Sequence, residues 1–146
     1  NTMKTLIFLL SAFIFFSCEE TNSVGDSRLR SVSGEPLGVE SDAYRLEDAY
    51  ITGEKLFIEV GYSGGCKEHE FTLIWPEVIT MIYPPQFSVS LSHDGNGDLC
   101  EAFLRDTLEF DLTKNPLGIS VEDMKKGEVT LINASQEDEQ IILKEK

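Results

Sequence analysis

Hydrophobic and polar residues alternate along most of the chain after about residue 38. A period of two residues is typical of strands with one buried face, whereas a surface helix repeats every 3.6 residues. Turn residues separate the alternating segments, as expected for an antiparallel sandwich. The pattern predicts an all-β fold, an antiparallel β-sandwich of immunoglobulin-like type, with apolar faces at residues 56–62, 69–75, 87–93, 100–104, 108–112, 129–133 and 141–143.

One segment between these strands has the features of a helix. Ser120 is suited to cap its start, Asp123 stands where a capping box places an acid, and Gly127 is suited to end it. We expect a single helix of about two turns here.

The segments that end at Trp75 and start at Phe87 are expected to pair as antiparallel neighbours. Large apolar side chains favour one register, because cross-strand apolar pairs stabilise a sheet. That register sets these residues opposite one another: Trp75 and Phe87, Leu73 and Val89, Phe71 and Leu91, His69 and His93. It places the β-carbons of the two histidines about 5 Å apart.

The first 17 residues have the parts of a secretory signal peptide: Lys4, an apolar run, and Ser17 as the small residue before the processing point. The run is shorter than the roughly 20 residues that span a membrane. Phe15-Phe16-Ser17-Cys18 resembles a bacterial lipoprotein box, in which the cysteine becomes the acylated N-terminus. We therefore expect palmitate-type acyl chains on Cys18; ordinary secretion with a nearby cut is the alternative.

The residues after Cys18 are rich in Ser, Glu, Gly, Asp and Arg. Such a composition buries too little apolar surface to order the backbone, so residues 18–37 are expected to form a flexible tether. Residues 38–146 then make one domain of ordinary size.

The chain carries a formal net charge of −14. This charge argues against nucleic acid as a partner, because phosphates would be repelled. It also argues against electrostatic binding to anionic lipid, which leaves the acyl chains as the expected contact with the membrane. We expect a domain of the bacterial cell envelope, periplasmic or surface-exposed.

Cys66 precedes one strand of the expected pair and Cys100 follows the other, at the same end. In an oxidising compartment a disulfide between them is the natural interpretation. Gly64-Gly65, just before Cys66, is expected to permit either a bend or a close approach of backbone at the strand edge.

The two histidines lie next to these cysteines in the sequence and raise the question of a metal. Two thiolates and two imidazoles would suit tetrahedral zinc, but a disulfide excludes that ligand set. Zinc or copper held by His69, His93 and a carboxylate, Asp98 or Asp94, is compatible with the disulfide. The alternative is a structural pair of histidines at the end of the core, hydrogen-bonded to these acids or to loop backbone.

Residues 94–98, Asp-Gly-Asn-Gly-Asp, carry oxygen ligands at alternate positions, as calcium loops do. Leu99 and Arg105 stand where an EF-hand requires Gly and Glu, so a tight polar turn explains the segment better. Ser63 lacks the flanking residues of a nucleophile elbow. No catalytic residue is identified, and enzyme activity is left open.

Residues 76–86 are unusually apolar for a connection. They are expected to form either a further short strand or an exposed flap that binds a protein or small-molecule partner.

The pattern Gly64-Gly65-Cys66-x-x-His69-x-Phe71, followed by His93-Asp94 and Asp98-x-Cys100, resembles a set of small secreted bacterial lipoproteins of uncharacterised function. The resemblance implies a shared sandwich core and a shared Cys-His end, and it brings no activity. The sequence thus predicts a lipid-anchored extracytoplasmic β-sandwich of binding or structural role. The second interpretation is a zinc- or copper-binding protein, or a metal-dependent enzyme, that uses His69 and His93.

Overall fold

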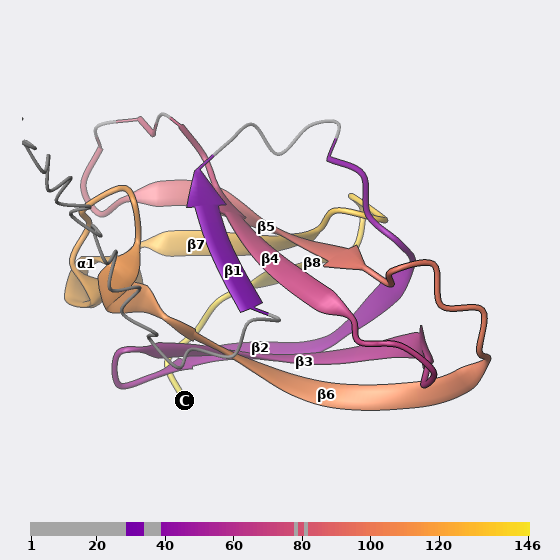
Figure 1. Cartoon of the computed structure of the whole chain (residues 1–146). Coiled ribbons are helices and arrows are strands. Elements are labelled where there is room, and N and C mark those ends of the chain that lie inside the picture. Colours follow the sequence, from indigo (N-terminus) through magenta and orange to yellow (C-terminus); the bar gives the residue numbers. More distant parts are fainter. Residues whose placement is uncertain (1–28, 34–38, 78, 81) are drawn as a thin grey trace, which may run out of the picture.

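The computed structural model describes residues 29–33, 39–77, 79–80 and 82–146. Two sheets form two layers, with a short helix at one end (Figure 1). The strands are β1 (Leu29–Ser33), β2 (Tyr44–Thr52), β3 (Lys55–Gly64), β4 (Glu70–Trp75), β5 (Gln86–Asp94), β6 (Ala102–Asp111), β7 (Glu128–Asn133) and β8 (Gln140–Ile142). A 3-10 helix, Leu112–Lys114, follows β6, and α1 spans Val121–Lys126. The prediction of an all-β fold with one short α-helix is confirmed.

The smaller sheet has the order β2-β3-β6 and is antiparallel, and the larger has the order β1-β4-β5-β7-β8. Two pairings in the larger sheet, β1 with β4 and β5 with β7, are parallel, so this sheet is mixed rather than wholly antiparallel. Alternation of side chains alone does not report strand direction, because both kinds of pairing place successive residues on opposite faces.

Strand β1 lies within the segment that was expected to be a tether. Residues 29–33 pair with residues Phe71 to Trp75 of β4 and form an edge of the larger sheet. The expected start of the folded domain at residue 38 is therefore too late. The signal peptide, Cys18 and the rest of the expected tether lie outside the described residues.

The core lies between the two sheets and contains most of the inward faces that the alternation predicts. The predicted face of residues 100–104 is not part of it, because Ala102 is exposed and Leu104 is only half-buried. Fully buried side chains come from both layers: Leu56, Ile58 and Val60 from the smaller sheet, and Leu73, Leu91 and Leu131 from the larger one. Burial of these side chains is the main term that favours folding, at roughly 1.5–3 kcal/mol each.

The buried amide of Asn133 links the two sheets. Its Nδ2 donates to the carbonyl of Tyr44 at 3.0 Å and to the carboxylate of Glu139. Its Oδ1 accepts from the backbone and the hydroxyl of Ser135. The end of β7 is thereby fixed against the start of β2, close to the predicted Cys-His end.

The predicted pairing of β4 with β5 is correct, but the register is shifted by two residues. Leu73 faces Leu91, and His93 faces Phe71 rather than His69. A shift of two residues keeps every side chain on the same face, so the apolar pattern does not distinguish the two registers. The connection from Pro76 to Pro85 is too long to fix the register as a tight turn would.

The helix begins as predicted, since the Ser120 side chain accepts from the backbone N–H of Asp123 at 3.1 Å. It also ends as predicted at Gly127, the C-cap, which has φ −85°, a value that any residue adopts. The glycine is needed for space, because a β-carbon at this position would lie 2.2 Å from the carbonyl oxygen of Pro85.

We predict that Gly127→Ala lowers the free energy of unfolding by about 1–3 kcal/mol, as overpacking does elsewhere. The added methyl group would push against backbone at the start of β5, where Glu128 N donates to the Pro85 carbonyl. Urea denaturation measures the loss. The neighbouring exposed change Lys126→Ala is the control and should stay within about 0.5 kcal/mol of the original chain. Equal stability of the two variants would contradict this account of Gly127.

Candidate functional site

The five residues singled out in the sequence meet at one end of the sandwich. Cys66 and His69 lie between β3 and β4, His93 lies near the end of β5, and Asp98 and Cys100 lie between β5 and β6. The predicted disulfide is present between Cys66 and Cys100, whose Cα atoms are 5.9 Å apart. It joins the connection that carries His69 to the one that carries Asp98.

The carboxylate of Asp98 organises this end. Its Oδ2 accepts from the backbone N–H groups of Cys66 at 2.8 Å and Lys67 at 2.9 Å, and from Nε2 of His69 at 3.2 Å. Its Oδ1 accepts from the backbone N–H of Cys100 at 2.9 Å. The side chain is 1% exposed. These donors, first Cys100 and then Cys66, hold the pKa of Asp98 well below its usual value, so the group is ionised.

The two imidazoles continue from Asp98 as a chain. Nδ1 of His69 lies 2.8 Å from Nε2 of His93, and the rings are nearly stacked with centroids 5.0 Å apart. His69 precedes β4, and its ring reaches diagonally to His93, which is paired with Phe71. The predicted meeting of the two histidines is thus observed, although not as directly opposite residues.

Gly64 makes room for this arrangement. A β-carbon on Gly64 would lie 2.5 Å from Cε1 and Nε2 of His69, and 3.2 Å from Oδ2 of Asp98. The imidazole therefore rests against bare backbone at the end of β3. This agrees with the close approach of backbone predicted for Gly64-Gly65.

Aromatic rings enclose the histidines. Phe71 stacks on His93 with centroids 4.5 Å apart, Tyr44 meets the same ring edge-on, and Tyr62 contacts both imidazoles. His69 is 7% exposed and His93 is 3% exposed. Burial, followed by the influence of His69, lowers the pKa of His93, so the neutral form is favoured.

His69, His93 and Asp98, the predicted metal ligands, are adjacent but do not converge on one point. Both nitrogens of His69 are engaged, one with Asp98 and the other with His93. In the part of the chain that the structure describes, the one group of three such side chains with donor atoms within 4.8 Å of one another is Cys66, Asp98 and Cys100. Two of these are joined as the disulfide.

Residues 94–98 form the tight turn that was preferred over a calcium loop. Asn96 and Gly97 have φ of 54° and 58°, and the N–H of Asp98 donates to the carbonyl of Gly95 at 2.9 Å. Oδ1 of Asp94 accepts from the N–H of Asn96. Nζ of Lys67 donates to the carbonyls of Asn96 and Gly97, so an ammonium group occupies these oxygens. No pattern in the sequence indicates this role of Lys67.

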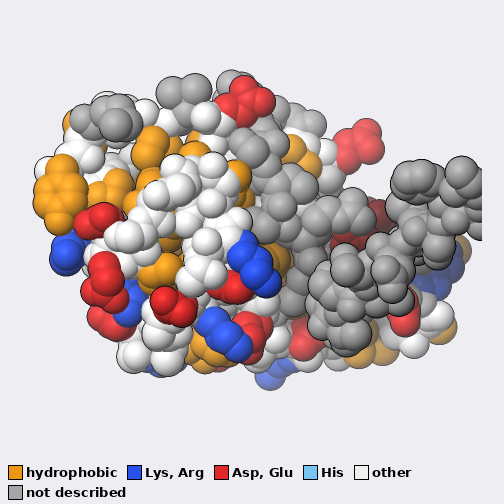
Figure 2. Space-filling model, turned by 60° about the vertical axis from the view of Figure 1, so that its left-hand side comes forward, with side chains coloured by type: hydrophobic (Ala, Val, Ile, Leu, Met, Phe, Trp, Pro, Cys, Tyr) orange, Lys and Arg blue, Asp and Glu red, His pale blue; other side chains and the backbone are white. Residues whose placement is uncertain are grey.

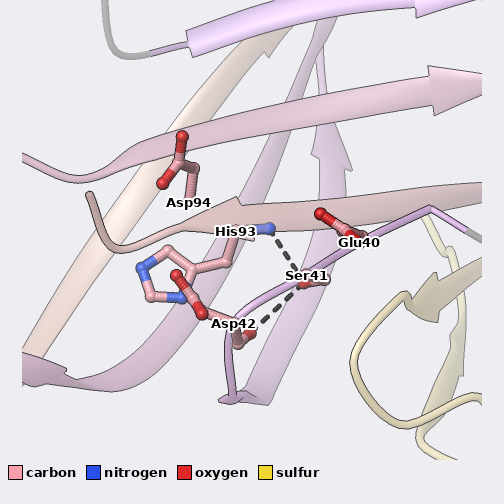
Figure 3. Close-up of a pocket in the computed structure, with 5 residues that line it drawn as sticks. All are labelled: Glu40, Ser41, Asp42, His93 and Asp94. Carbon is pink, nitrogen blue, oxygen red and sulfur yellow. Dashed lines mark hydrogen bonds between the residues drawn. The ribbon is translucent and has the colours of Figure 1, made fainter. Parts of the chain in front are cut away.

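An open pocket of about 510 Å³ adjoins His93 and is lined by Glu40, Ser41, Asp42 and Asp94 as well (Figure 3). The 40–42 segment runs beside the end of β5: the N–H of Asp42 donates to the carbonyl of His93 at 2.8 Å, and the N–H of His93 donates to Oγ of Ser41 at 3.0 Å. Oδ2 of Asp42 accepts from the N–H of Gly95. This acidic segment precedes the first strand of the predicted sandwich, so the alternating pattern gives no sign of its place beside β5.

Ser41 supplies the hydroxyl group of this pocket. The hydrogen bonds of this hydroxyl are not those of an activated nucleophile. Its Oγ accepts from the backbone of His93 and donates to the carbonyl oxygen of Asp42 at 3.2 Å. An activated serine would instead donate to a ring nitrogen. The pocket thus presents oxygen atoms and one imidazole.

The apolar connection between β4 and β5 contains no strand in its described residues, 76–77, 79–80 and 82–85. The expected further strand is therefore not found there. Ile82 is 47% exposed and Tyr83 is 73% exposed. On the face shown in Figure 2, hydrophobic, acidic and basic side chains are interspersed. No helix in the described part of the chain is long and apolar enough to cross a membrane.

Comparison with solved structures supports the fold. The chain is similar to a protein of unknown function from Bacteroides vulgatus, with a TM-score of 0.53 and 13% identity, over 78% of this chain and 54% of that one. It is also similar to a protein described as toxin-related from Parabacteroides distasonis, with a TM-score of 0.50 and 16% identity, over 78% of this chain and 58% of that one. The chain thus spans little more than half of either protein.

Family models and curated protein sequences give no match. At these identities the two structures show a shared architecture, and function has to be argued from the site itself.

The hydrogen bonds of Asp98 predict how stability depends on pH. Its folded pKa lies below the ordinary value near 3.9, so the unfolded chain takes up the proton first and stability falls as the pH drops below about 5. The lowered pKa of His93 acts in the same direction from about pH 6.5 downwards, because the unfolded imidazole is protonated first.

We predict that Asp98→Asn lowers the melting temperature at neutral pH on the order of 10 °C, since an amide cannot accept all four hydrogen bonds. The difference from the original chain should shrink as the pH approaches 2. Thermal melts monitored by circular dichroism across this range test both statements. A difference that stays constant with pH would show that the charge of Asp98 is not the cause.

Proposed function

We propose that this chain is a lipid-anchored extracytoplasmic β-sandwich protein with a binding or structural role. The observation that carries the proposal is the Cys66–Cys100 disulfide within an ordered site. Disulfides of this kind persist in oxidising compartments outside the cytosol. The lipoprotein box that ends at Cys18 adds the anchor, because several acyl chains on one residue hold a protein firmly at a membrane.

The geometry of the Cys-His end favours a binding or structural role over catalysis. The ionised Asp98 and the two imidazoles are linked to each other, and the nearby hydroxyl of Ser41 donates to backbone. A metal held by His69, His93 and Asp98 together would require these links to break. The second interpretation of the sequence is therefore less well supported in its original form.

We predict that a fatty-acid analogue supplied to cells labels the protein and that Cys18→Ala abolishes the label. The expected mechanism is acylation of the cysteine that becomes the N-terminus. Cys66→Ala is the matched control, because it removes a cysteine that lies in the folded domain. Absence of label on the original chain, or label that persists in Cys18→Ala, would contradict the anchor.

The connection between β4 and β5 is the surface that we propose for a protein partner. Its side chains Ile82 and Tyr83 are apolar or aromatic, neighbouring and exposed. Aromatic residues of this kind are enriched at protein interfaces.

A photoreactive residue in place of Tyr83 should therefore cross-link to a discrete partner in intact cells, and Ile82→Ser should weaken that cross-link by about tenfold, the effect of a moderate interface residue. The control carries the photoreactive residue in place of Glu122, whose side chain is 73% exposed on α1. The same cross-linked products from both positions would contradict the proposed surface.

A further inference from the structure

A second open pocket, of about 500 Å³, lies at the surface of the smaller sheet. Among its described lining residues two, Arg45 and Arg105, are basic and one, Glu47, is acidic. The whole chain has 12 lysines and arginines against 26 acids. An excess of positive charge in a pocket of so acidic a chain points to an anionic ligand.

The strand register places the two arginines on either side of a glycine. Arg45 of β2 pairs with Gly61 of β3, and Gly61 pairs in turn with Arg105 of β6. Residues that are directly opposite point to the same face of a sheet, and the neighbouring Val60 is buried in the core, so the arginine side chains lie on the outer face. Strands are about 4.8 Å apart, which puts the two arginine Cα atoms roughly 10 Å apart. Both guanidinium groups are thus within reach of one anion placed between them.

Gly61 allows an aromatic ring to form the floor between the arginines. A β-carbon on Gly61 would lie 2.7 Å from Cζ of Phe103 and 3.0 Å from Oε1 of Glu47. The ring of Phe103 therefore rests on bare backbone, and a larger residue at this point of β3 would displace it. Phe103 is nevertheless 55% exposed. Ligand sites are typically lined by aromatic side chains with a few well-placed polar groups, and this ring supplies the apolar part.

The guanidinium groups have hydrogen-bond donors to spare. Nε of Arg105 donates to Oε1 of Glu47 at 3.0 Å, and Cζ of Arg105 lies 5.6 Å from the centre of the Phe103 ring. The Nη groups of Arg105 have no hydrogen-bond partner among the described residues, and its side chain is 72% exposed. The guanidinium of Arg45 makes no hydrogen bond or ion pair in the part of the chain that the structure describes. Because Glu47 offsets one of the two positive charges, one positive charge remains for a ligand.

A carboxylate fits these groups better than a more highly charged anion does. It carries a single negative charge, which matches the one positive charge left over, and its two oxygens match the planar fork of a guanidinium group. We propose that the pocket binds a small ring-bearing carboxylate, with the carboxylate held by Arg45 and Arg105 and the ring lying against Phe103. Ser63 and Gln136, which also line the pocket, offer hydrogen bonds to polar substituents of the ligand.

The inference rests on the binding role proposed above and names a ligand chemistry for it. It depends neither on Cys18 nor on the connection between β4 and β5, so its failure would leave the labelling and cross-linking experiments untouched. Sugar acids and aromatic acids both have a ring beside a carboxylate, and the C–H groups of either ring are attracted to the negative face of an aromatic side chain. One probe of each kind is therefore used to distinguish the two sources.

Titration of the full, isotope-labelled chain with galacturonate and, separately, with benzoate near neutral pH tests the proposal by nuclear magnetic resonance. We expect at least one probe to bind with a dissociation constant on the order of 1 mM or tighter, and to shift the resonances of the Gly61 backbone amide and the Arg45 Nε–H group. The methyl ester of galacturonate and benzamide keep the ring but lose the charge, so they should bind at least about tenfold more weakly. Binding of galacturonate alone would identify a sugar acid as the ligand, and binding of benzoate alone an aromatic acid.

Variants of exposed side chains locate the site. Arg45→Gln should weaken binding at least about tenfold, and Phe103→Leu, which keeps the residue apolar but removes the ring, about threefold or more. Lys114→Gln is the matched control, because it also removes one positive charge, from a side chain that is 80% exposed, and it should bind as the original chain does. If Phe103→Leu does not fold, as judged by circular dichroism, Arg45→Gln decides the matter, because the Arg45 guanidinium has no partner among the described residues. The proposal is overturned if neither probe binds, if the uncharged analogues bind equally well, or if Arg45→Gln and Lys114→Gln bind alike.

Discussion

The hydrogen bonds of the Asp98 carboxylate are the interaction on which the functional end of this domain depends. The disulfide joins two connections, but one covalent bond between Cys66 and Cys100 leaves their backbones free to rotate. Asp98 removes that freedom by accepting from the backbone on both sides of the bridge and from His69. A carboxylate does this better than a neutral group, because charge-assisted hydrogen bonds are roughly twice as strong as neutral ones. The histidine chain is built outwards from this fixed charge.

The topology of the larger sheet produces the pocket beside that chain. Strand β7 pairs with β5 only as far as Leu91, which faces Asn133. Beyond this point the 41–42 segment lies along β5 and bonds to the backbone of His93 before the chain enters β2 in the other sheet. Acidic residues of a connecting segment are thereby placed next to a buried imidazole. The imidazole of His93 is held by strand β5, whereas the acids of the connecting segment, Glu40 and Asp42, are exposed.

Much of the fold could be predicted from local sequence patterns. The predictions were wrong where the structure depends on which distant strands pair, and in which register and direction. The inward faces, the start of the helix and the disulfide follow from alternation, capping chemistry and compartment. The two-residue shift between β4 and β5 escaped detection because both registers bury the same side chains. Strand β1 is short and polar, and only its pairing with the edge of β4 makes it a strand. The direction of β7 relative to β5 is likewise a property of the whole chain path.

The residues of the site could be predicted from the sequence, but the interactions among their side chains could not. His69, His93, Asp98 and the cysteines do gather, since they flank neighbouring strand ends. Whether two histidines and an acid converge on a metal or link into a chain depends on differences of 2–3 Å, the scale of one hydrogen bond. In this structure each link uses a ring nitrogen, and both nitrogens of His69 are used in this way, so no metal can be bound by the two rings and Asp98 together. The order of the chain joins Asp98, through His69, to His93 on β5, so these residues gather at one end of the domain without converging on a single metal site.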